Sequence, residues 1–323
     1  MKIIGIGNAL VDVLTRLEDD QLLEKLGLPR GSMQLVDAER SAQIQQETKN
    51  LPKQMASGGS AANTIHGLAK LGMETAFVGS VGKDETGKFF EEDLKNSGIT
   101  PRLFYSDAPS GIANGMISPD GERTFGTFLG AALDLSPDKL SQDTFSGYDL
   151  LHVEGYLVQN HALLETILKL AKEAGLKISL DLASYNVVEE NIDFLREMVK
   201  KYVDIVFANE EEAKAFTGAS PEEALELIAQ SADIAVVKVG SEGSMVKQGE
   251  NKTVISPIKA KAVDTTGAGD LYASGFLYGL AHDVSFEKAG YIGSLLAATV
   301  IEVVGAKFDE QKWHEIREKV KAL

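Results

Sequence analysis

The residues best suited to chemistry lie in segment 264–270, which reads DTTGAGD and comes directly before an expected helix. The small residues Gly267, Ala268 and Gly269 let backbone N–H groups approach a ligand closely, and the N-terminus of a helix favours an anion such as phosphate. Asp270 would place a carboxylate beside this anion hole, which suits removal of a hydroxyl proton while a transferred phosphoryl group is stabilised. A glycine-rich loop with an aspartate as a simple helix cap is an equally open interpretation.

A second glycine-rich segment precedes another expected helix. Gly58 and Gly59 would allow backbone contact with a small polar ligand, and the side chain of Asn63 offers both a donor and an acceptor. Taken alone, the pattern is also typical of a plain turn with a helix cap at Ser60.

The expected N-terminal strand, residues 3–7, is followed by Asn8 and Asp12. Leu10 stands where a dinucleotide-binding fingerprint would need its third glycine, which argues against a nicotinamide dehydrogenase. A carboxylate just beyond the end of a strand instead suits hydrogen bonding to paired hydroxyl groups of a ligand.

Two further strand ends carry polar or glycine residues. Asn209 and Glu212 follow an expected strand, at the edge where open α/β sheets bind ligands, and their oxygens could hold a hydrated Mg²⁺. Lys238, Gly240 and Gly243 could accommodate a nucleotide, although such a pattern alone is more typical of a turn.

Strands and helices alternate along most of the chain, which predicts an α/β fold with a parallel sheet covered by helices on both faces. Strands are expected at 3–7, 75–80, 150–154, 177–181, 204–208 and 234–239. Helices are expected at 60–71, 86–96, 161–174, 189–202, 221–230, 269–281, 286–303 and 309–321. Residues 12–37 and 103–128 break the alternation. We expect them to form a small β lid over the ligand site of a single domain spanning 1–323.

Composition excludes several classes of protein. The formal net charge of −16 disfavours binding to nucleic acid or to an anionic membrane surface. The absence of cysteine excludes disulfides, thiolate metal sites and thiol catalysis. No signal peptide and no apolar run of the ~18 residues that a membrane span needs is present, so we expect a cytoplasmic protein.

Taken together, these motifs resemble the pfkB (ribokinase-like) family of carbohydrate and nucleoside kinases. GGSAAN at 58–63 and DTTGAGD at 264–270 look like the two signatures of that family, in the right order, and the N-x-x-E motif at 209–212 is also present. The likeness covers essentially the whole chain. It implies a ribokinase-like three-layer α/β/α sandwich with a predominantly parallel central sheet and a small β lid.

The resemblance also implies a set of roles, with ATP and Mg²⁺ as co-substrate and metal, and in some members a monovalent cation such as K⁺. The expected catalytic residues are Asp270 as the base, Gly267, Ala268 and Gly269 as the anion hole, and Arg123. The expected acceptor-binding residues are Asp12, Gly58, Gly59, Asn63 and Asn8. The expected nucleotide-binding residues are Lys238, Gly240, Gly243 and Thr265. The expected metal-binding residues are Asn209 and Glu212 for Mg²⁺ and Asp264 for the monovalent cation.

Segments 7–12, 31–33 and 120–124 are similar to adenosine-kinase-like bacterial members of the family. By this resemblance Arg123 would reach from the lid toward the transferred phosphate. Ser60 stands where the signature of ribokinase itself carries lysine, which argues against ribose as the acceptor.

The acceptor is therefore expected to be a nucleoside, adenosine first, with a sugar such as fructose as the alternative. The apolar residues Leu10, Met33, Leu35 and Phe128 could hold a purine between them or could simply pack the lid. A noncatalytic sugar- or nucleoside-binding protein remains the alternative from another class. Whether the chain is a monomer or a homodimer is left open.

Overall fold

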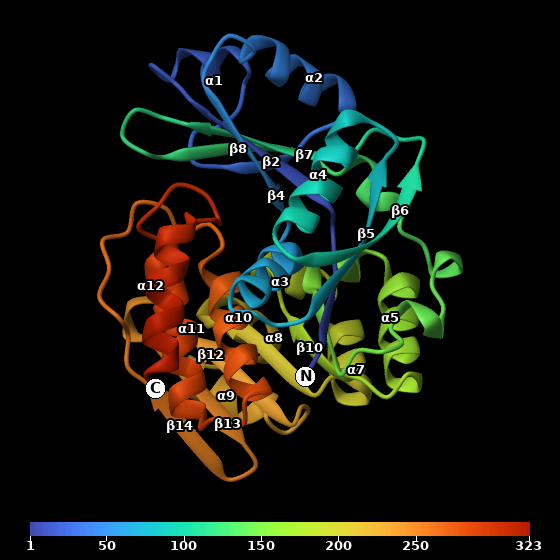
Figure 1. Ribbon diagram of the computed structural model, residues 1–323, viewed down its shortest axis with the longest axis vertical. Coiled ribbons are helices and arrows are strands. Elements are labelled where there is room, and N and C mark those ends of the chain that lie inside the picture. The colour runs from blue at the N-terminus through green and yellow to red at the C-terminus, as the bar shows by residue number, and fades with distance from the viewer.

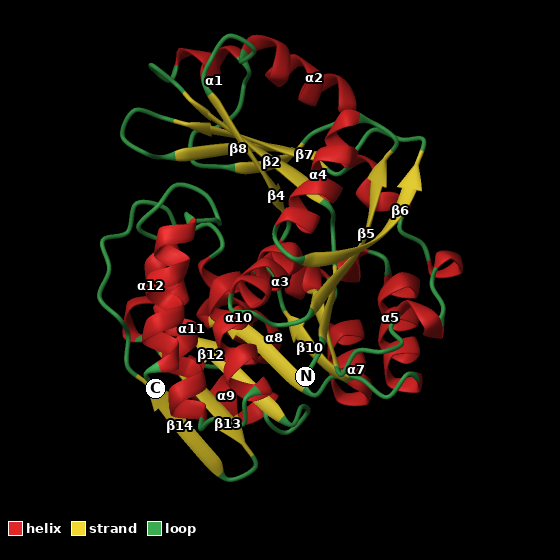
Figure 2. Ribbon diagram, in the orientation of Figure 1, coloured by secondary structure: helices red, strands yellow, loops and turns green.

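The computed structural model describes residues 1–323 and contains two β-sheets of unequal size (Figure 1, Figure 2). The strands are β1 (Ile3–Ile6), β2 (Leu10–Arg16), β3 (Met33–Leu35), β4 (Lys53–Gly58), β5 (Thr75–Gly82), β6 (Ile99–Ser106), β7 (Gly111–Ile117), β8 (Arg123–Phe128), β9 (Leu150–Glu154), β10 (Lys177–Asp181), β11 (Ile205–Asn209), β12 (Ile234–Lys238), β13 (Ser244–Gln248) and β14 (Asn251–Ile255). The helices are α1 (Gln21–Lys25), α2 (Ala38–Glu47), α3 (Ser60–Lys70), α4 (Glu85–Asn96), α5 (His161–Glu173), α6 (Tyr185–Glu190), α7 (Ile192–Tyr202), α8 (Glu210–Thr217), α9 (Pro221–Ile228), α10 (Ala268–Ala281), α11 (Phe286–Val300) and α12 (Glu310–Lys321). No helix is both long enough and apolar enough to cross a membrane.

The large sheet has nine strands in the order β14-β13-β12-β11-β10-β9-β1-β5-β6. All neighbours from β12 to β6 pair in parallel, and β13 and β14 add an antiparallel hairpin at the other edge. Strands β1, β5 and β9 are buried along their whole length, as expected for parallel strands covered on both faces. The predicted α/β fold with a predominantly parallel sheet is confirmed.

Helices cover the two faces of this sheet in separate sets. Helices α5, α7, α8 and α9 pack on one face in the largest apolar cluster. Helices α3, α4 and α10 pack on the other face, and α11 and α12 add an outer layer against α10. Helices α3 and α10 lie on the side of the large sheet that faces the small sheet (Figure 1).

The small sheet has five strands in the order β3-β8-β7-β2-β4 and forms a separate lobe at the top of Figure 1. Its outer face is covered by α1 and α2, and the buried side chains there include Leu23, Ile44 and Met116. The opposite face carries Leu35, Thr127, Ala113 and Asp12, which the strand register places in one row across the sheet. This inner face lies toward the helix N-termini of the main body.

The boundaries of the small sheet differ from those expected, 12–37 and 103–128. Residues 99–106 form β6, which pairs with β5 along its whole length at the edge of the large sheet. Pro101 is tolerated there because an edge strand need not donate every N–H group. Strand β4 and helix α2 also belong to the small-sheet lobe. Strand β4 was not predicted, because KQMASG has no apolar alternation.

Candidate active site

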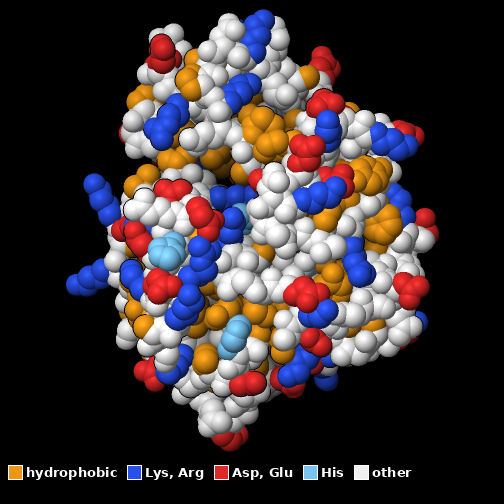
Figure 3. Space-filling model, viewed as in Figure 1, with side chains coloured by type: hydrophobic (Ala, Val, Ile, Leu, Met, Phe, Trp, Pro, Cys, Tyr) orange, Lys and Arg blue, Asp and Glu red, His pale blue; other side chains and the backbone are white.

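A cleft of about 1100 Å³ lies between the inner face of the small sheet and the carboxyl ends of the large-sheet strands. The space-filling view in Figure 3 shows the surface hollowed between the upper lobe and the body, with apolar side chains bordering the hollow on the side of the lobe. Residues from four of the predicted motifs line this cleft, namely Asp12, Asn63, Lys238 and Asp270.

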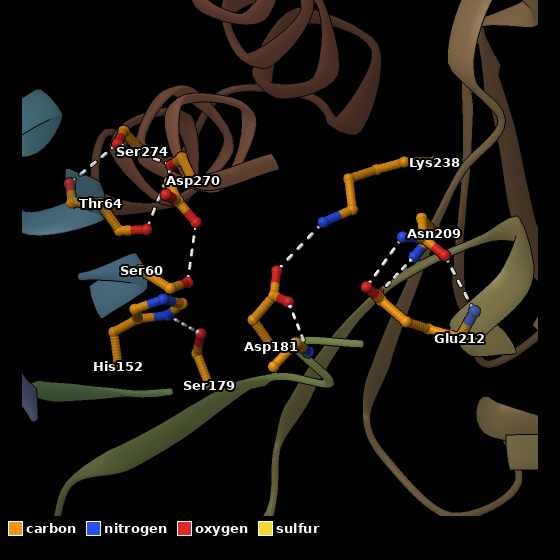
Figure 4. Close-up of polar contacts among 11 residues, drawn as sticks. Ser60, Thr64, His152, Ser179, Asp181, Asn209, Glu212, Lys238, Asp270 and Ser274 are labelled. Carbon is orange, nitrogen blue, oxygen red and sulfur yellow. Dashed lines mark hydrogen bonds and ion pairs between the residues drawn. The ribbon is translucent and has the colours of Figure 1, made fainter. Parts of the chain in front are cut away.

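Asp270 lies in the first turn of α10, at the bottom of this cleft. Its carboxylate accepts hydrogen bonds from Ser60 Oγ at 2.7 Å and from Asn63 Nδ2 at 3.0 Å (Figure 4 shows the contact with Ser60). Burial raises the pKa of Asp270 to about 6, although the hydrogen bonds from Asn63 and Ser60 lower it. The group is therefore mostly ionised at neutral pH and basic enough to accept a proton.

The glycine loop before α10 has the backbone geometry of an anion site. Gly267 is the N-cap, with φ of 76°, and a Cβ there would lie 2.6 Å from Cβ of Ala306. The predicted trio of Gly267, Ala268 and Gly269 lines the cleft directly beside Asp270. The N–H groups of Gly267 and Gly269 are among the free donors at the helix N-terminus, while the N–H of Ala268 donates to the carbonyl of Thr265 at 3.2 Å.

The expected acceptor end contains Asp12, Gly59 and Asn63 on the wall of the cleft. Burial raises the pKa of Asp12 to about 7, while the positive charge of Lys307 lowers it. Gly58 leaves room for this carboxylate, since a Cβ there would lie 2.4 Å from Cγ of Asp12. Oδ1 of Asn63 is buried and has no hydrogen-bond partner, so it is free to bind a ligand hydroxyl.

Ser60 and Asn8 have different local roles from those expected. Gly59, not Ser60, is the N-cap of α3, because the Ser60 hydroxyl donates to Asp270 instead. Asn8 does not line the cleft. Its side chain donates to Glu154 Oε1 at 2.7 Å, and Glu154 Oε2 accepts the N–H of Ala61 at 3.2 Å. Glu154 therefore joins the β1–β2 connection to the start of α3.

Asn209 and Glu212 form a reciprocal capping box at the start of α8. Glu212 Oε1 accepts from Asn209 Nδ2 and Oε2 accepts from the Asn209 N–H, both at 2.8 Å, while Asn209 Oδ1 accepts from the Glu212 N–H (Figure 4). Burial, together with nearby Asp181, raises the pKa of Glu212 to about 7. The three-residue spacing that predicted two magnesium ligands therefore also forms the N-terminal cap of α8. Both residues still line the cleft.

The nucleotide-binding candidates Lys238, Gly240, Gly243 and Thr265 all line the same cleft. Lys238 Nζ lies 3.0 Å from Oδ2 of Asp181, which ends β10 (Figure 4). Burial lowers the pKa of Lys238, but Asp181 and Glu212 outweigh that effect, so the pKa is raised and the ammonium group stays charged. Asp181 was not predicted, because nothing in its local sequence distinguishes it from the end of an ordinary strand.

Arg123 and Asp264 form an ion pair that joins β8 to the loop before α10. Arg123 also donates to Thr266 Oγ1 at 2.9 Å, and Asp264 accepts the N–H groups of Thr266 at 3.0 Å and Gly305 at 2.7 Å. Asp264 does not line the cleft and lies apart from Asn209 and Glu212. The Asp264 carboxylate therefore fixes this loop, and its role at a monovalent-cation site, separate from the Mg²⁺ role expected of Asn209 and Glu212, stays a prediction.

The apolar lining of the cleft includes Phe125, which the sequence analysis missed. Met33 pairs with Phe125 in register and is 56% exposed, and Leu35 on the same face is 59% exposed. Phe128 lies on the opposite face of β8, the face on which Gly126 meets Ile44 of α2. Side chains alternate between the two faces of β8, so Phe125 and Phe128 must point to opposite sides, but the sequence does not show which side faces the cleft.

Comparison with known proteins agrees with this fold. The model of the pfkB family carbohydrate kinases matches residues 32–313, so the chain belongs to the pfkB family. Kinases of this family are phosphotransferases that act on sugar hydroxyl groups and use ATP with Mg²⁺. The resemblance stated from the motifs is confirmed.

Individual relatives differ in the acceptor that their names give. A probable sugar kinase from Rhizobium etli has a TM-score of 0.88 and 32% identity, covering 100% of this chain and 99% of that one. The adenosine kinase from Sinorhizobium meliloti has a TM-score of 0.87 and 32% identity, covering 98% of this chain and 99% of that one. The 5-dehydro-2-deoxygluconokinase of Bacillus licheniformis is 32% identical over 262 residues, which are 76% of this chain and 80% of that protein.

Proposed function

We propose that this protein transfers the γ-phosphoryl group of ATP to a primary hydroxyl group of a ribose-type acceptor, a nucleoside and adenosine first. The main support is the position of Asp270. Its carboxylate lies at the bottom of the cleft, beside the N-terminus of α10, and is oriented by Ser60 and Asn63 from α3. A base and an anion hole side by side are what transfer to a hydroxyl group needs.

In this reaction the acceptor oxygen forms a bond to the γ-phosphorus, and the bond from that phosphorus to the bridging oxygen of ADP breaks. Asp270 accepts the proton of the acceptor hydroxyl, and the N–H groups of Gly267, Ala268 and Gly269 stabilise the charge on the transferred group. Asp12 and Asn63, with the backbone at Gly58 and Gly59, bind the other hydroxyl groups of the acceptor. Lys238, Gly240, Gly243 and Thr265 contact the nucleotide.

The acidic side chains of the cleft fit a Mg²⁺ ion that arrives with ATP. Asp181, Glu212 and Asp270 face one cleft, yet no group of three acidic or histidine side chains is close enough to hold a metal ion alone. Mg²⁺ suits such a site because it keeps several waters and binds phosphate oxygens. We propose that Asn209 and Glu212 hold these waters, where the ion would neutralise phosphate charge. A monovalent cation near Asp264 would have to be bound by backbone carbonyl groups.

The nucleoside is favoured by the apolar part of the cleft. Phe125, Met33 and Leu35 lie on the inner face of the small sheet, where a purine base would cover them. The likeness to the Sinorhizobium meliloti adenosine kinase supports the same choice. A sugar acceptor is the second candidate, because curated relatives are named 5-dehydro-2-deoxygluconokinase and ribokinase.

A panel of acceptors tests the proposal. Formation of ADP from ATP and Mg²⁺ is measured with adenosine, inosine, ribose, fructose and 5-dehydro-2-deoxygluconate. The proposal predicts the highest kcat/KM with a nucleoside, and a higher value for a sugar would replace the nucleoside by the second candidate. ATP and nucleoside binding without turnover of any acceptor would indicate the noncatalytic alternative. Cytoplasmic location and a monomer or homodimer stay predictions.

A further inference from the structure

One ammonium group, that of Lys238, lies directly beside the glycine loop. Its Nζ atom is 3.0 Å from the position that a Cβ on Gly269 would occupy. The side chain is 14% exposed and lines the cleft between the start of α10 and Asp181. Figure 4 shows the ammonium group pointing toward Asp181, with Asp270 and Glu212 on either side. A group bound to the N–H donors of the loop would therefore lie within reach of Lys238.

The other cation expected near the phosphate, Arg123, does not line the cleft. Arg123 pairs with Asp264 and with Thr266 Oγ1, and this contact holds β8 to the loop. Lys238 is thus the cation that the structure places next to the reacting end of the cleft. In phosphoryl transfer, charge on the transferred group must be neutralised by cations and oriented donors.

We propose that Lys238 is a catalytic residue that contacts the transferred phosphoryl group, and that Asp181 is the positioning residue that orients its ammonium group. This inference rests on the proposed kinase function and assigns Lys238 to the γ-phosphoryl group in particular. Lys238 stays protonated throughout. The proton of the acceptor hydroxyl goes to Asp270, and ADP leaves with the bridging oxygen.

The sheet offers a matched control lysine. Lys247 on β13 is also 14% exposed and pairs with Glu226 at 2.9 Å, but it does not line the cleft. Lys247→Met removes a lysine of the same exposure from the same sheet, although its partner Glu226 is 45% exposed and Asp181 only 8%. Lys247→Met therefore controls for loss of a lysine charge away from the cleft, and the free energy of unfolding of both variants separates a loss of stability from a loss of ATP binding.

The first measurement is calorimetric binding of ATP and of ADP, with Mg²⁺ and without acceptor. Lys238→Met should weaken ATP binding by roughly tenfold or more and ADP binding much less, because only ATP carries the γ-phosphate. In turnover with the best acceptor of the panel, kcat should fall about 10²–10³-fold. Lys238→Arg should restore part of both, and Lys247→Met should match the wild-type protein.

Equal losses of ATP and ADP affinity in Lys238→Met, or a kcat within threefold of wild type, would overturn the proposal. If the wild-type protein phosphorylates no acceptor, the kinase function fails on its own. The preference for ATP over ADP still tests Lys238 in that case, since it requires no turnover. Should Lys238→Met not fold, Lys238→Gln, which also removes the charge, gives the same readout, and an unchanged preference and kcat in that variant count against the contact.

Asp181 is tested as a positioning residue. Asp181→Asn should lower kcat, and it should also lower the preference for ATP over ADP. Both effects should be smaller than those of Lys238→Met, and the KM for the acceptor should stay close to that of the wild-type protein. Asp181→Glu should recover part of the loss because it keeps the carboxylate. A loss of stability in Asp181→Asn with an unchanged preference and kcat would show that Asp181 only supports the fold.

Discussion

Asn63 donates its side-chain amide to the carboxylate of Asp270 at 3.0 Å, although the two residues are 207 positions apart in the chain. The contact joins the two glycine-rich segments that carry the family motifs. Helix α3 orients the carboxylate of Asp270 through Ser60 and Asn63, and in the proposed reaction Asn63 also binds the acceptor. The position of Asp270 therefore depends on both helix N-termini.

Removing a hydrogen bond to Asp270 should shift the pH dependence of turnover. Ser60 and Asn63 both lower the pKa of Asp270, which burial otherwise raises to about 6. In Ser60→Ala the pKa should rise further, so the acidic limb of the kcat profile moves to higher pH. The surface variant Ser231→Ala is the control, and an identical acidic limb in Ser60→Ala would contradict the role of Asp270 as the base.

The contribution of Glu154 to stability should fall as the pH rises toward neutrality. Burial raises the pKa of Glu154 to about 7, above its ordinary value of 4.5, so the unfolded chain loses this proton at lower pH than the folded one. The stabilisation that protonated Glu154 contributes is complete below the ordinary pKa of 4.5, and it is lost as the pH rises through the folded-state pKa of about 7. Glu154→Gln should reduce this loss between pH 4.5 and pH 8 by on the order of 2 kcal/mol.

Urea unfolding of the wild-type protein and of Glu154→Gln at both pH values measures this difference. Glu18 on the surface, as Glu18→Gln, provides the control. Equal pH dependence of the free energy of unfolding in all three proteins would show that the Glu154 carboxyl group has no raised pKa.

Gly267→Ala should abolish the anion site. The residue has φ of 76°, and a Cβ would lie 2.6 Å from Cβ of Ala306. Gly249 has φ of 54° and open space around it, so Gly249→Ala reports only the backbone cost of about 1–2 kcal/mol. We expect a larger loss of stability and a much lower kcat for Gly267→Ala, whereas equal effects of the two substitutions would argue against a tightly packed loop.

The two phenylalanines of β8 test the choice of acceptor. Phe125 lines the cleft and Phe128 lies on the opposite face. Phe125→Ala should raise the KM for adenosine by about 10- to 100-fold, since stacking of a base on an aromatic ring contributes ~1–3 kcal/mol. The KM for ATP should not change. A similar adenosine KM in Phe125→Ala and Phe128→Ala would favour a sugar acceptor.

The sequence predicted the parts of the site that depend on local pattern. The loop at 264–270, the glycines before α3 and the alternation of strands and helices are all visible in short segments. Asp181, Glu154 and Phe125 were missed because their roles come from contacts between distant segments. Ser60 makes the reason plain: its position predicts a helix cap, but its hydroxyl group donates to Asp270, 210 positions away.

Local spacing can also have two uses at once. Asn209 and Glu212 were predicted as magnesium ligands, and their three-residue spacing also forms a capping box. Ser220 shows the reverse case: Ser220 and Glu223 have the spacing of a capping box, but the side chain of Ser220 makes no cap hydrogen bond. The sequence does not show whether such a side chain caps a helix or faces a ligand, because both depend on its rotamer.

The central claim is that Asp270 is the base of a phosphotransferase. Replacement by asparagine keeps the shape of the side chain and removes its basicity. The most direct measurement is kcat of Asp270→Asn with the best acceptor, together with the KM for that acceptor and the matched surface variant Asp283→Asn. We predict that kcat falls by about 10²–10⁴-fold with KM largely kept. A kcat within tenfold of the wild-type value would contradict the assignment.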